Sequence, residues 1–324
     1  MKKAAADLLQ YKEQVILSGI FSLAWDSSLI VFIQRFMNET LVKLFGLITE
    51  FGDAMILVAV VGLFYWALNK ELGKKLVVYL SLINIVNPCL KCLIRRKRPY
   101  MLDPEIQCLK PVNTEGDIYD VISQDYSFPS GHAANCIAVY GKLMKSSRRA
   151  VWKVVLALLT LLVGVSRFAL GVHYPTDILA GWLVAAAAIA LYRLLEKKAG
   201  RNKAYLIIDI LGLAGFFIAK TNDFYTGYGM MLGATLGILF EEKYVRFEET
   251  ARFLPALLRT LVGAGLYLGL NTLLKLPFSD AFLNSGTLPA FCVRAARYAL
   301  IVFLLLGVYP LCFKKAGALF GKAK

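Results

Sequence analysis

The sequence predicts an all-α fold, a polytopic transmembrane helical bundle of about nine membrane helices preceded by N-terminal interfacial helices. Of the 324 residues, 58% are hydrophobic and 18% are charged, and the mean hydropathy is +0.60. Soluble domains carry about 25% charged residues, so we expect a membrane protein. Apolar runs of roughly 15 to 23 residues also recur along the chain, and a helix of that length crosses a bilayer.

The first 52 residues differ from the rest. Their apolar segments are broken by Asp26, Arg35, Glu39 and Lys43, a pattern typical of interfacial amphipathic helices. The chain starts with the basic stretch MKKAAADLLQYKEQ, but no convincing small-residue cleavage site follows, so we expect no cleaved signal peptide.

Nine apolar segments follow, each long enough to be read as a membrane crossing. They span residues 53–69, 76–94, 132–145, 151–170, 176–194, 204–220, 226–240, 254–276 and 291–313.

The net charge of +15 is explained by loops at one membrane face. If the helices alternate, five basic segments face one side, which is then cytoplasmic by the positive-inside rule. These are NKELGKK, KSSRRAVWK, RLLEKKAGRNK, EEKYVRFEE and the tail FKKAGALFGKAK. We therefore expect no nucleic-acid partner. The other side holds the loop 95–131, where RRKRP puts four basic residues in an extracytoplasmic position, which indicates an anionic partner there.

The six cysteines predict neither a disulfide framework nor a metal site. Four of them, Cys89, Cys136, Cys292 and Cys312, lie in or beside apolar helices, where cysteine packs as a small hydrophobe. Cys89 and Cys92 form a C-x-x-C at a helix end, but no second pair accompanies it.

Two polar clusters are predicted to meet at the extracytoplasmic face. In KCLIRRKRP, Lys91 and Arg98 lie seven residues apart, about two helical turns, so both cations can share one face. In YSFPSGH, Ser130 can cap a helix, Gly131 permits close backbone approach, and His132 follows at the helix start. The free amides of such a helix start favour an anion.

A third cluster, SRFALGVHYPTD, lies between two membrane helices on the same predicted side. Pro175 marks a helix start, so Asp177 falls in the first turn, within reach of the His173 ring. A carboxylate there would fix the imidazole tautomer. Arg167 adds a third cation, and guanidinium geometry suits phosphoryl oxygens.

Together the clusters predict phosphoryl transfer. We expect His173 to attack phosphorus, oriented by Asp177, while His132 protonates the leaving oxygen and later activates water. The phosphate-binding groups would be Lys91, Arg98, Arg167 and the segment Ser130–Gly131. Because both histidines have these roles, no metal site and no cofactor are expected.

These residues resemble the type 2 phosphatidic acid phosphatase superfamily, which includes glucose-6-phosphatase, sphingosine-phosphate phosphatases and vanadium haloperoxidases. The resemblance covers roughly residues 50–196, and the first helices look similar to those of bacterial relatives of the sphingosine-phosphate phosphatases. It implies a helical core, a phosphate pocket at the outer membrane face, a nucleophile at His173 and an acid at His132. Three matched motifs carry it: Lys91, Arg98 and Pro99; Pro129, Ser130, Gly131 and His132; Ser166, Arg167, His173 and Asp177.

We accordingly expect an N-terminal interfacial region at 1–52, a core with the three motifs at 53–203, and a four-helix membrane extension at 204–324. Six-helix family members lack this extension, which could line a groove for a lipid tail, form a homodimer contact or move lipid.

The expected protein is a multi-pass cell-membrane hydrolase of a lipid phosphate, such as undecaprenyl pyrophosphate, phosphatidate, phosphatidylglycerophosphate or a sphingoid phosphate, through phosphohistidine. Its expected partners are that substrate and the membrane lipids. A sugar phosphatase similar to glucose-6-phosphatase, a vanadate haloperoxidase and a non-catalytic lipid-binding or transport protein remain alternatives.

Overall fold

The computed structural model describes residues 23–250 and 252–313, and these residues form α-helices, π-helical turns and loops, without a strand. The expectations for residues 1–22 and for the tail from 314 onward lie outside this range. By their internal contacts the residues form two units, each assembled from distant parts of the chain. The first contains Met1–Asp53 and Cys89–Ala187, and the second contains Ala54–Pro88 and Ala188–Lys324. The predicted division at residues 52 and 203 stays a prediction.

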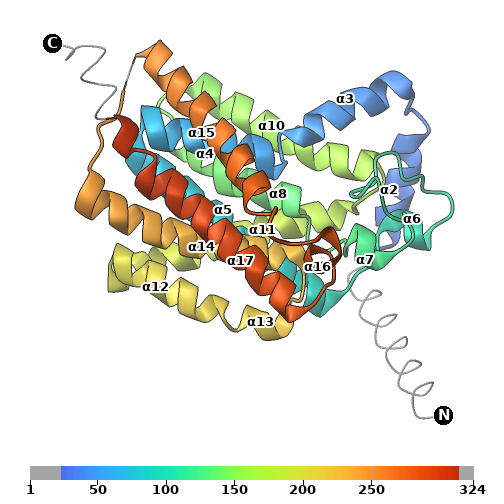
Figure 1. Cartoon of the computed structure of the whole chain (residues 1–324). Helices are drawn as coiled ribbons and strands as arrows, with labels where there is room; N and C mark the ends of the chain where they lie inside the picture. Colours follow the sequence, from blue (N-terminus) through green and yellow to red (C-terminus); the bar gives the residue numbers. More distant parts are fainter. Residues whose placement is uncertain (1–22, 251, 314–324) are drawn as a thin grey trace. The chain divides into compact units, whose positions relative to one another are not determined.

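The first unit is built around α10, which packs against the N-terminal helices α2 and α3 and against α8 (Figure 1). Its small hydrophobic core joins Ile30 of α2 to Tyr100, Ile106, Leu170, Val172 and Tyr174 from loops and helix ends. The helices of this unit are α2 (Ala24–Gln34), α3 (Glu39–Glu50), α6 (Pro99–Leu102), α7 (Val121–Gln124), α8 (Gly131–Cys136), the π-helical η2 (Ile137–Gly141), α9 (Lys142–Ser146) and α10 (Ala150–Ala169).

Two long helices contribute to both units, α5 (Lys70–Ile94) and α11 (Pro175–Ala199). The other helices of the second unit are α4 (Ala54–Leu63), η1 (Phe64–Leu68), α12 (Arg201–Gly212), α13 (Gly215–Ile218), α14 (Asn222–Phe240), η3 (Glu241–Val245), α15 (Phe253–Leu273), α16 (Asp280–Leu283), α17 (Leu288–Phe303) and η4 (Leu304–Val308).

In the second unit, α14 lies along α17 at close range (Figure 1). The approach depends on Gly229, Gly233 and Gly237, spaced four residues apart on α14, because a Cβ at Gly229 would lie 3.1 Å from Cα of Ala295 and one at Gly233 would lie 3.0 Å from Cα of Ala299. Small residues at this spacing are a common way for membrane helices to pack without a gap. Larger residues at these positions would separate the two helices.

Five helices among the described residues are long and apolar enough to cross a membrane, or six if Glu39–Glu50 and Ala54–Leu68 form one bent span. The five are Lys70–Leu102, Ala150–Ala169, Pro175–Ala199, Phe253–Leu273 and Leu288–Phe313. The predicted count of nine is therefore not confirmed, although the all-helical membrane class is. The predicted crossing at 132–145 is interrupted by the π-helical turn η2, and the one at 204–220 breaks after Gly212. The crossing at 226–240 is part of α14, which is not among the five.

Candidate active site

The predicted residues from 166 to 177 form the end of α10, a tight turn and the first turn of α11. Gly171 adopts a φ of +79°, a conformation that glycine reaches without strain, and the chain reverses there. Beyond the turn, the amide of Tyr174 donates to Oδ2 of Asp177 at 2.8 Å, and the amide of Asp177 donates to the carbonyl of Tyr174 at 3.0 Å. This local pairing holds the Asp177 carboxylate beside His173.

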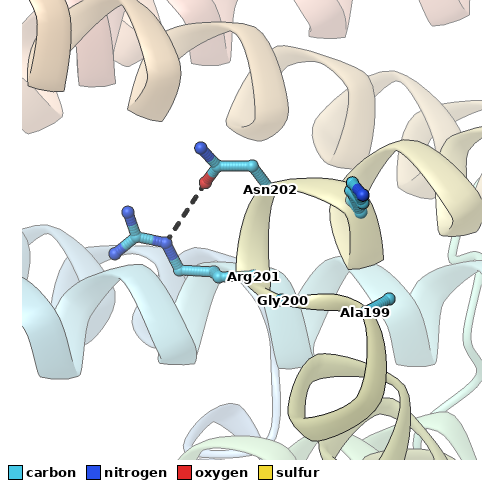
Figure 2. A pocket seen from close by; sticks show the side chains of 5 residues that line it. Ala199, Gly200, Arg201 and Asn202 are labelled. Atoms are coloured by element: carbon cyan, nitrogen blue, oxygen red, sulfur yellow. Dashed lines mark hydrogen bonds between the residues drawn. The ribbon is translucent and has the colours of Figure 1, made fainter.

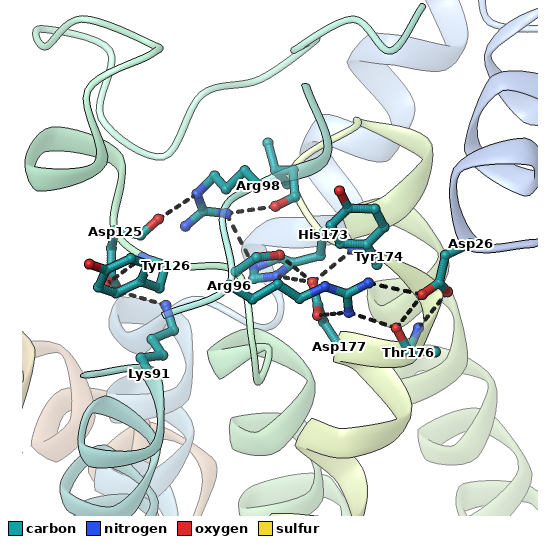
Figure 3. Close-up of polar contacts among 12 residues, drawn as sticks. Asp26, Lys91, Arg96, Arg98, Asp125, Tyr126, His173, Tyr174, Thr176 and Asp177 are labelled. Carbon is teal, nitrogen blue, oxygen red and sulfur yellow. Dashed lines mark hydrogen bonds and ion pairs between the residues drawn. The ribbon is translucent and has the colours of Figure 1, made fainter. Parts of the chain in front are cut away.

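His173 lies between a carboxylate and a guanidinium (Figure 3). The residue is 2% exposed, with Nδ1 3.4 Å from Oδ2 of Asp177 and Nε2 3.5 Å from Nη1 of Arg98. A carboxylate beside Nδ1 favours the proton on that nitrogen and leaves the lone pair on Nε2. Nε2 is therefore the nitrogen placed to attack an anion held by Arg98.

Arg98 is buried and held in place by backbone carbonyl groups. Its Nε donates to the carbonyls of Gln124 at 2.9 Å and Asp125 at 3.0 Å, and Nη1 donates to the carbonyl of Val172 at 2.7 Å. These partners orient the guanidinium but carry no net charge. Its positive charge is thus available to an anion, and anion binding would repay the desolvation of the guanidinium.

Arg167 is also buried and is paired with a neutral group. Its Nη1 donates to the hydroxyl of Thr49 at 3.0 Å, while its buried Nε has no hydrogen-bond partner among the residues that the structure describes. The buried hydroxyl of Ser130 also has none. Buried polar atoms without partners are rare and need an explanation. Each group could donate to an oxygen of a bound anion.

The Ser130–His132 segment packs tightly against α11. A Cβ at Gly181 of α11 would lie 2.6 Å from the carbonyl oxygen of Ser130, so only glycine allows this approach. The amide of Ser130 donates to the carbonyl of Asp177 at 3.0 Å and is not free for a ligand. The amides of Gly131 and His132, in the first turn of α8, have no acceptor within the helix.

The structure brings the motif residues of the first unit into one cluster. His132 lies where the charges of Arg167, His173, Lys91 and Arg98 act on it. The structure gives no direct hydrogen bond between His132 and the other predicted residues. The roles of these residues stay predictions, although their placement suits them.

Lys91 is bound to an internal anion. Its Nζ lies 2.5 Å from Oδ2 of Asp125, in the segment before α8. Asp125 adopts φ 61° and ψ 164°, a region that residues other than glycine avoid. Its amide donates to the carbonyl of Val121, and its carbonyl accepts from Arg98, so its conformation is fixed from several directions.

We expect Asp125→Asn to lower the inhibition constant of orthovanadate about two- to fivefold, because a partly exposed ion pair is worth roughly 0.5–1 kcal/mol and its loss frees Lys91. Titrating phosphatase activity with orthovanadate measures this change. Glu115→Gln removes one carboxylate from the same loop, at an exposed position away from Lys91, and should leave inhibition unchanged. Equal constants in the wild type and Asp125→Asn would contradict the prediction.

The pH dependence of turnover follows from the surroundings of His173. Burial, together with the positive charges of Arg98, Arg167 and Lys91, holds the pKa of His173 well below its ordinary value of 6.5. As the predicted nucleophile, His173 must be neutral, so activity should persist as the pH falls below 6.5 and decline only near the lowered pKa of this residue. We expect the acid limb of kcat/KM to lie well below pH 6.5, whereas a limb at or above that pH would contradict this assignment.

Sequence reasoning missed several residues that hold the site together. Arg96 is 1% exposed and donates to Asp177 at 2.7 Å and to Asp26 at 3.0 Å (Figure 3). Ser127 donates its hydroxyl to Asp177, and Thr49 contacts Arg167. The RRKRP cluster was a signal for Arg96, but the sequence does not distinguish it from its neighbours.

An open hollow in the second unit contains none of the predicted site residues (Figure 2). It is lined by Ala199, Gly200, Arg201, Asn202 and Lys203. Its guanidinium, on Arg201, is paired with Glu242 at 2.7 Å, unlike those of Arg98 and Arg167.

Comparisons with known proteins point to one superfamily. Residues 72–201 match the family model of the PAP2 superfamily, and residues 225–322 match that of the PAP2 superfamily phosphatase transmembrane extension. The first match contains all the motif residues discussed above, and the second covers most of the predicted membrane extension.

Similar curated proteins include two phosphatases. The chain is 25% identical over 171 residues to an undecaprenyl-diphosphatase of Sulfolobus acidocaldarius. The aligned region covers 52% of this chain and 77% of that protein. It is 24% identical over 293 residues to sphingosine-1-phosphate phosphatase 1 of Mus musculus. This alignment covers 80% of this chain and 66% of that protein. The chain thus spans just under two thirds of the mouse protein.

A crystal structure of a transmembrane PAP2-type phosphatidylglycerolphosphate phosphatase from Bacillus subtilis is also similar. The TM-score is 0.42 at 23% sequence identity, and the alignment covers 59% of this chain and 96% of that chain.

Proposed function

The chain belongs to the PAP2 superfamily of phosphatases, and on that premise we propose that it hydrolyses a lipid phosphate or lipid diphosphate through a phosphohistidine on His173. The observation that carries the proposal is the pair of buried guanidinium groups, Arg98 and Arg167, whose described partners are neutral oxygens. Arg98 lies 3.5 Å from Nε2 of His173. A phosphoryl group bound by both arginines would lie beside the nucleophile.

In the first step, Nε2 of His173 would form a bond to phosphorus as the bond from phosphorus to the leaving oxygen breaks. Asp177 would hold the Nδ1 proton and stabilise the positive ring. His132 would give its proton to the leaving oxygen. In the second step, neutral His132 would take a proton from water as water attacks phosphorus, which releases phosphate and restores His173.

The three cations would stabilise charge on the phosphoryl oxygens, which is the main demand of phosphoryl transfer. Arg98 and Arg167 carry no ion pair that a substrate has to displace, whereas Lys91 has to exchange Asp125 for the substrate. Because these side chains supply the positive charge, we propose that turnover is independent of a metal ion. Activity that stays dependent on magnesium after controlled chelation would contradict this part.

We propose a lipid substrate because the matched membrane extension and the apolar helices place the protein in a bilayer, where an acyl or prenyl tail is available. The relatives named above act on an undecaprenyl diphosphate and on a sphingosine phosphate, by their names. The basic loops of the chain favour an active site on the extracytoplasmic face.

The test compares phosphate release by the purified protein from undecaprenyl diphosphate, undecaprenyl phosphate, phosphatidate and glucose 6-phosphate. We expect turnover of at least one lipid, inhibition by orthovanadate, and a background set by the double variant His132→Ala/His173→Ala. Preferred turnover of glucose 6-phosphate would favour the sugar phosphatase instead. Lipid hydrolysis equal to that of the double variant would favour a binding or transport protein.

A further inference from the structure

Asp26, in the first turn of α2, reaches the start of α11 near the predicted nucleophile. Its side chain is fully buried, and its Oδ2 accepts from Nη2 of Arg96 at 3.0 Å and from the hydroxyl of Thr176 at 2.5 Å (Figure 3). Its Oδ1 accepts from the backbone amide of Thr176 at 3.2 Å. Asp26 therefore provides, from a distant helix, the carboxylate that the N-terminus of α11 favours.

Arg96 connects Asp26 to the catalytic cluster. One guanidinium lies between two buried carboxylates, with Nη1 2.7 Å from Oδ1 of Asp177 and Nη2 3.0 Å from Oδ2 of Asp26. Its Nη1 also donates to the hydroxyl of Thr176 at 2.7 Å, and its Cζ lies 3.7 Å from the ring centre of Tyr174. Arg96, Asp26 and Asp177 together carry one net negative charge, with a single cation shared between two anions.

This net charge lies beside a ring that must become positive. Phosphorylation of Nε2, with a proton on Nδ1, puts a positive charge on His173. Cations already surround the ring, and among the described residues Asp177 is the carboxylate that contacts it. The charged and titratable groups that act on His173 are Lys91, Arg98, His132, Arg167 and Asp177. Without Asp26, Arg96 would neutralise Asp177 more completely and draw its carboxylate away from Nδ1.

We propose that Asp26 is a positioning residue for phosphoryl transfer, which shares Arg96 with Asp177 so that the Asp177 carboxylate stays aligned against Nδ1 of His173 and its negative charge is not fully offset by Arg96. The inference rests on the proposed function and extends it to a helix outside the matched region of residues 72–201. A simpler alternative is that Asp26 only attaches α2 to the rest of the unit. In that case its loss would lower stability but leave the chemistry of the folded protein unchanged.

The test uses Asp26→Asn in the full-length protein, assayed in detergent with short-chain phosphatidate and a short-chain prenyl diphosphate. We expect kcat to fall about ten- to a hundredfold, as for a small misplacement of catalytic groups, with KM changed less than about twofold. The acid limb of the pH profile should move to lower pH, because the ring loses a negative neighbour and is harder to protonate. Glu39→Gln makes the same carboxylate-to-amide change at an exposed position of α3. This variant should match the wild type in kcat, in KM and in the position of the acid limb.

Unchanged kcat and an unchanged acid limb in Asp26→Asn would overturn the inference, even if the variant is less stable. Should that variant not fold, Asp26→Glu decides, since it keeps the charge but displaces it by one methylene. For Asp26→Glu, the inference requires a kcat below that of the wild type and an acid limb at the wild-type position. A kcat equal to that of the wild type would overturn the inference. A wild-type protein that hydrolyses neither lipid would overturn the proposed function, and this inference with it.

Discussion

Replacing His173 with alanine is expected to lower kcat by at least about a thousandfold, because the variant lacks the nitrogen proposed to receive the phosphoryl group. Nε2 of His173 lies 3.5 Å from Arg98, and Nδ1 is held by Asp177 at 3.4 Å. Steady-state phosphate release measures the loss. Trapping with labelled substrate under alkaline quench, which preserves phosphohistidine, should label the wild type but not the variant.

His132→Ala is the informative companion variant. It keeps the nucleophile but lacks the group that would activate water, so its phosphoenzyme should be hydrolysed slowly and accumulate with a substrate whose leaving group needs no protonation. Orthovanadate protection against heat would show that each variant still folds and binds an anion. Full activity of His173→Ala, or labelling of His173→Ala equal to that of the wild type, would contradict the assignment.

Replacing Arg96 with glutamine is expected to lower the free energy of unfolding by about 3–5 kcal/mol, because it leaves two buried carboxylates without their shared cation. Asp26 and Asp177 are both fully buried. Thermal or denaturant unfolding in detergent, compared with the wild type, measures the loss.

Arg95→Gln is a matched control, since it makes the same change at the adjacent residue. Arg95 is exposed, and its Nε donates to the carbonyl of Cys92 at 2.9 Å. A surface change of this kind should alter stability by less than about 0.5 kcal/mol. Equal losses in both variants would show that Arg96 has no special structural role.

The membrane class and the local geometry around His173 were predictable from the sequence. Hydropathy indicates burial in lipid directly, since a crossing helix needs a long apolar run. Four of the five candidate membrane spans overlap predicted segments closely, and the fifth, Lys70–Leu102, also includes α6. The spacing of His173, Pro175 and Asp177 predicted the contact between ring and carboxylate because only one helical turn separates them. The count of crossings was less predictable, since a π-helical turn and a helix break interrupt apolar runs without changing their composition.

The partners of the buried charges depended on the tertiary structure. Arg95 adopts φ 54° at the end of α5, and the chain turns there, so that Arg95 is exposed while Arg96 and Arg98 are buried. Nothing in four consecutive basic residues distinguishes them.

The sequence by itself determined that this is a helical membrane protein with the three motifs of its superfamily, because composition and short spacings encode both. Only the tertiary structure decided that Asp26 shares Arg96 with Asp177 and that Asp125 pairs with Lys91. These ion pairs join residues 34 to 81 positions apart. At such separations, the choice of ion-pair partners depends on how the helices pack and on which charges the packing shields from water. No local sequence pattern predicts these partners.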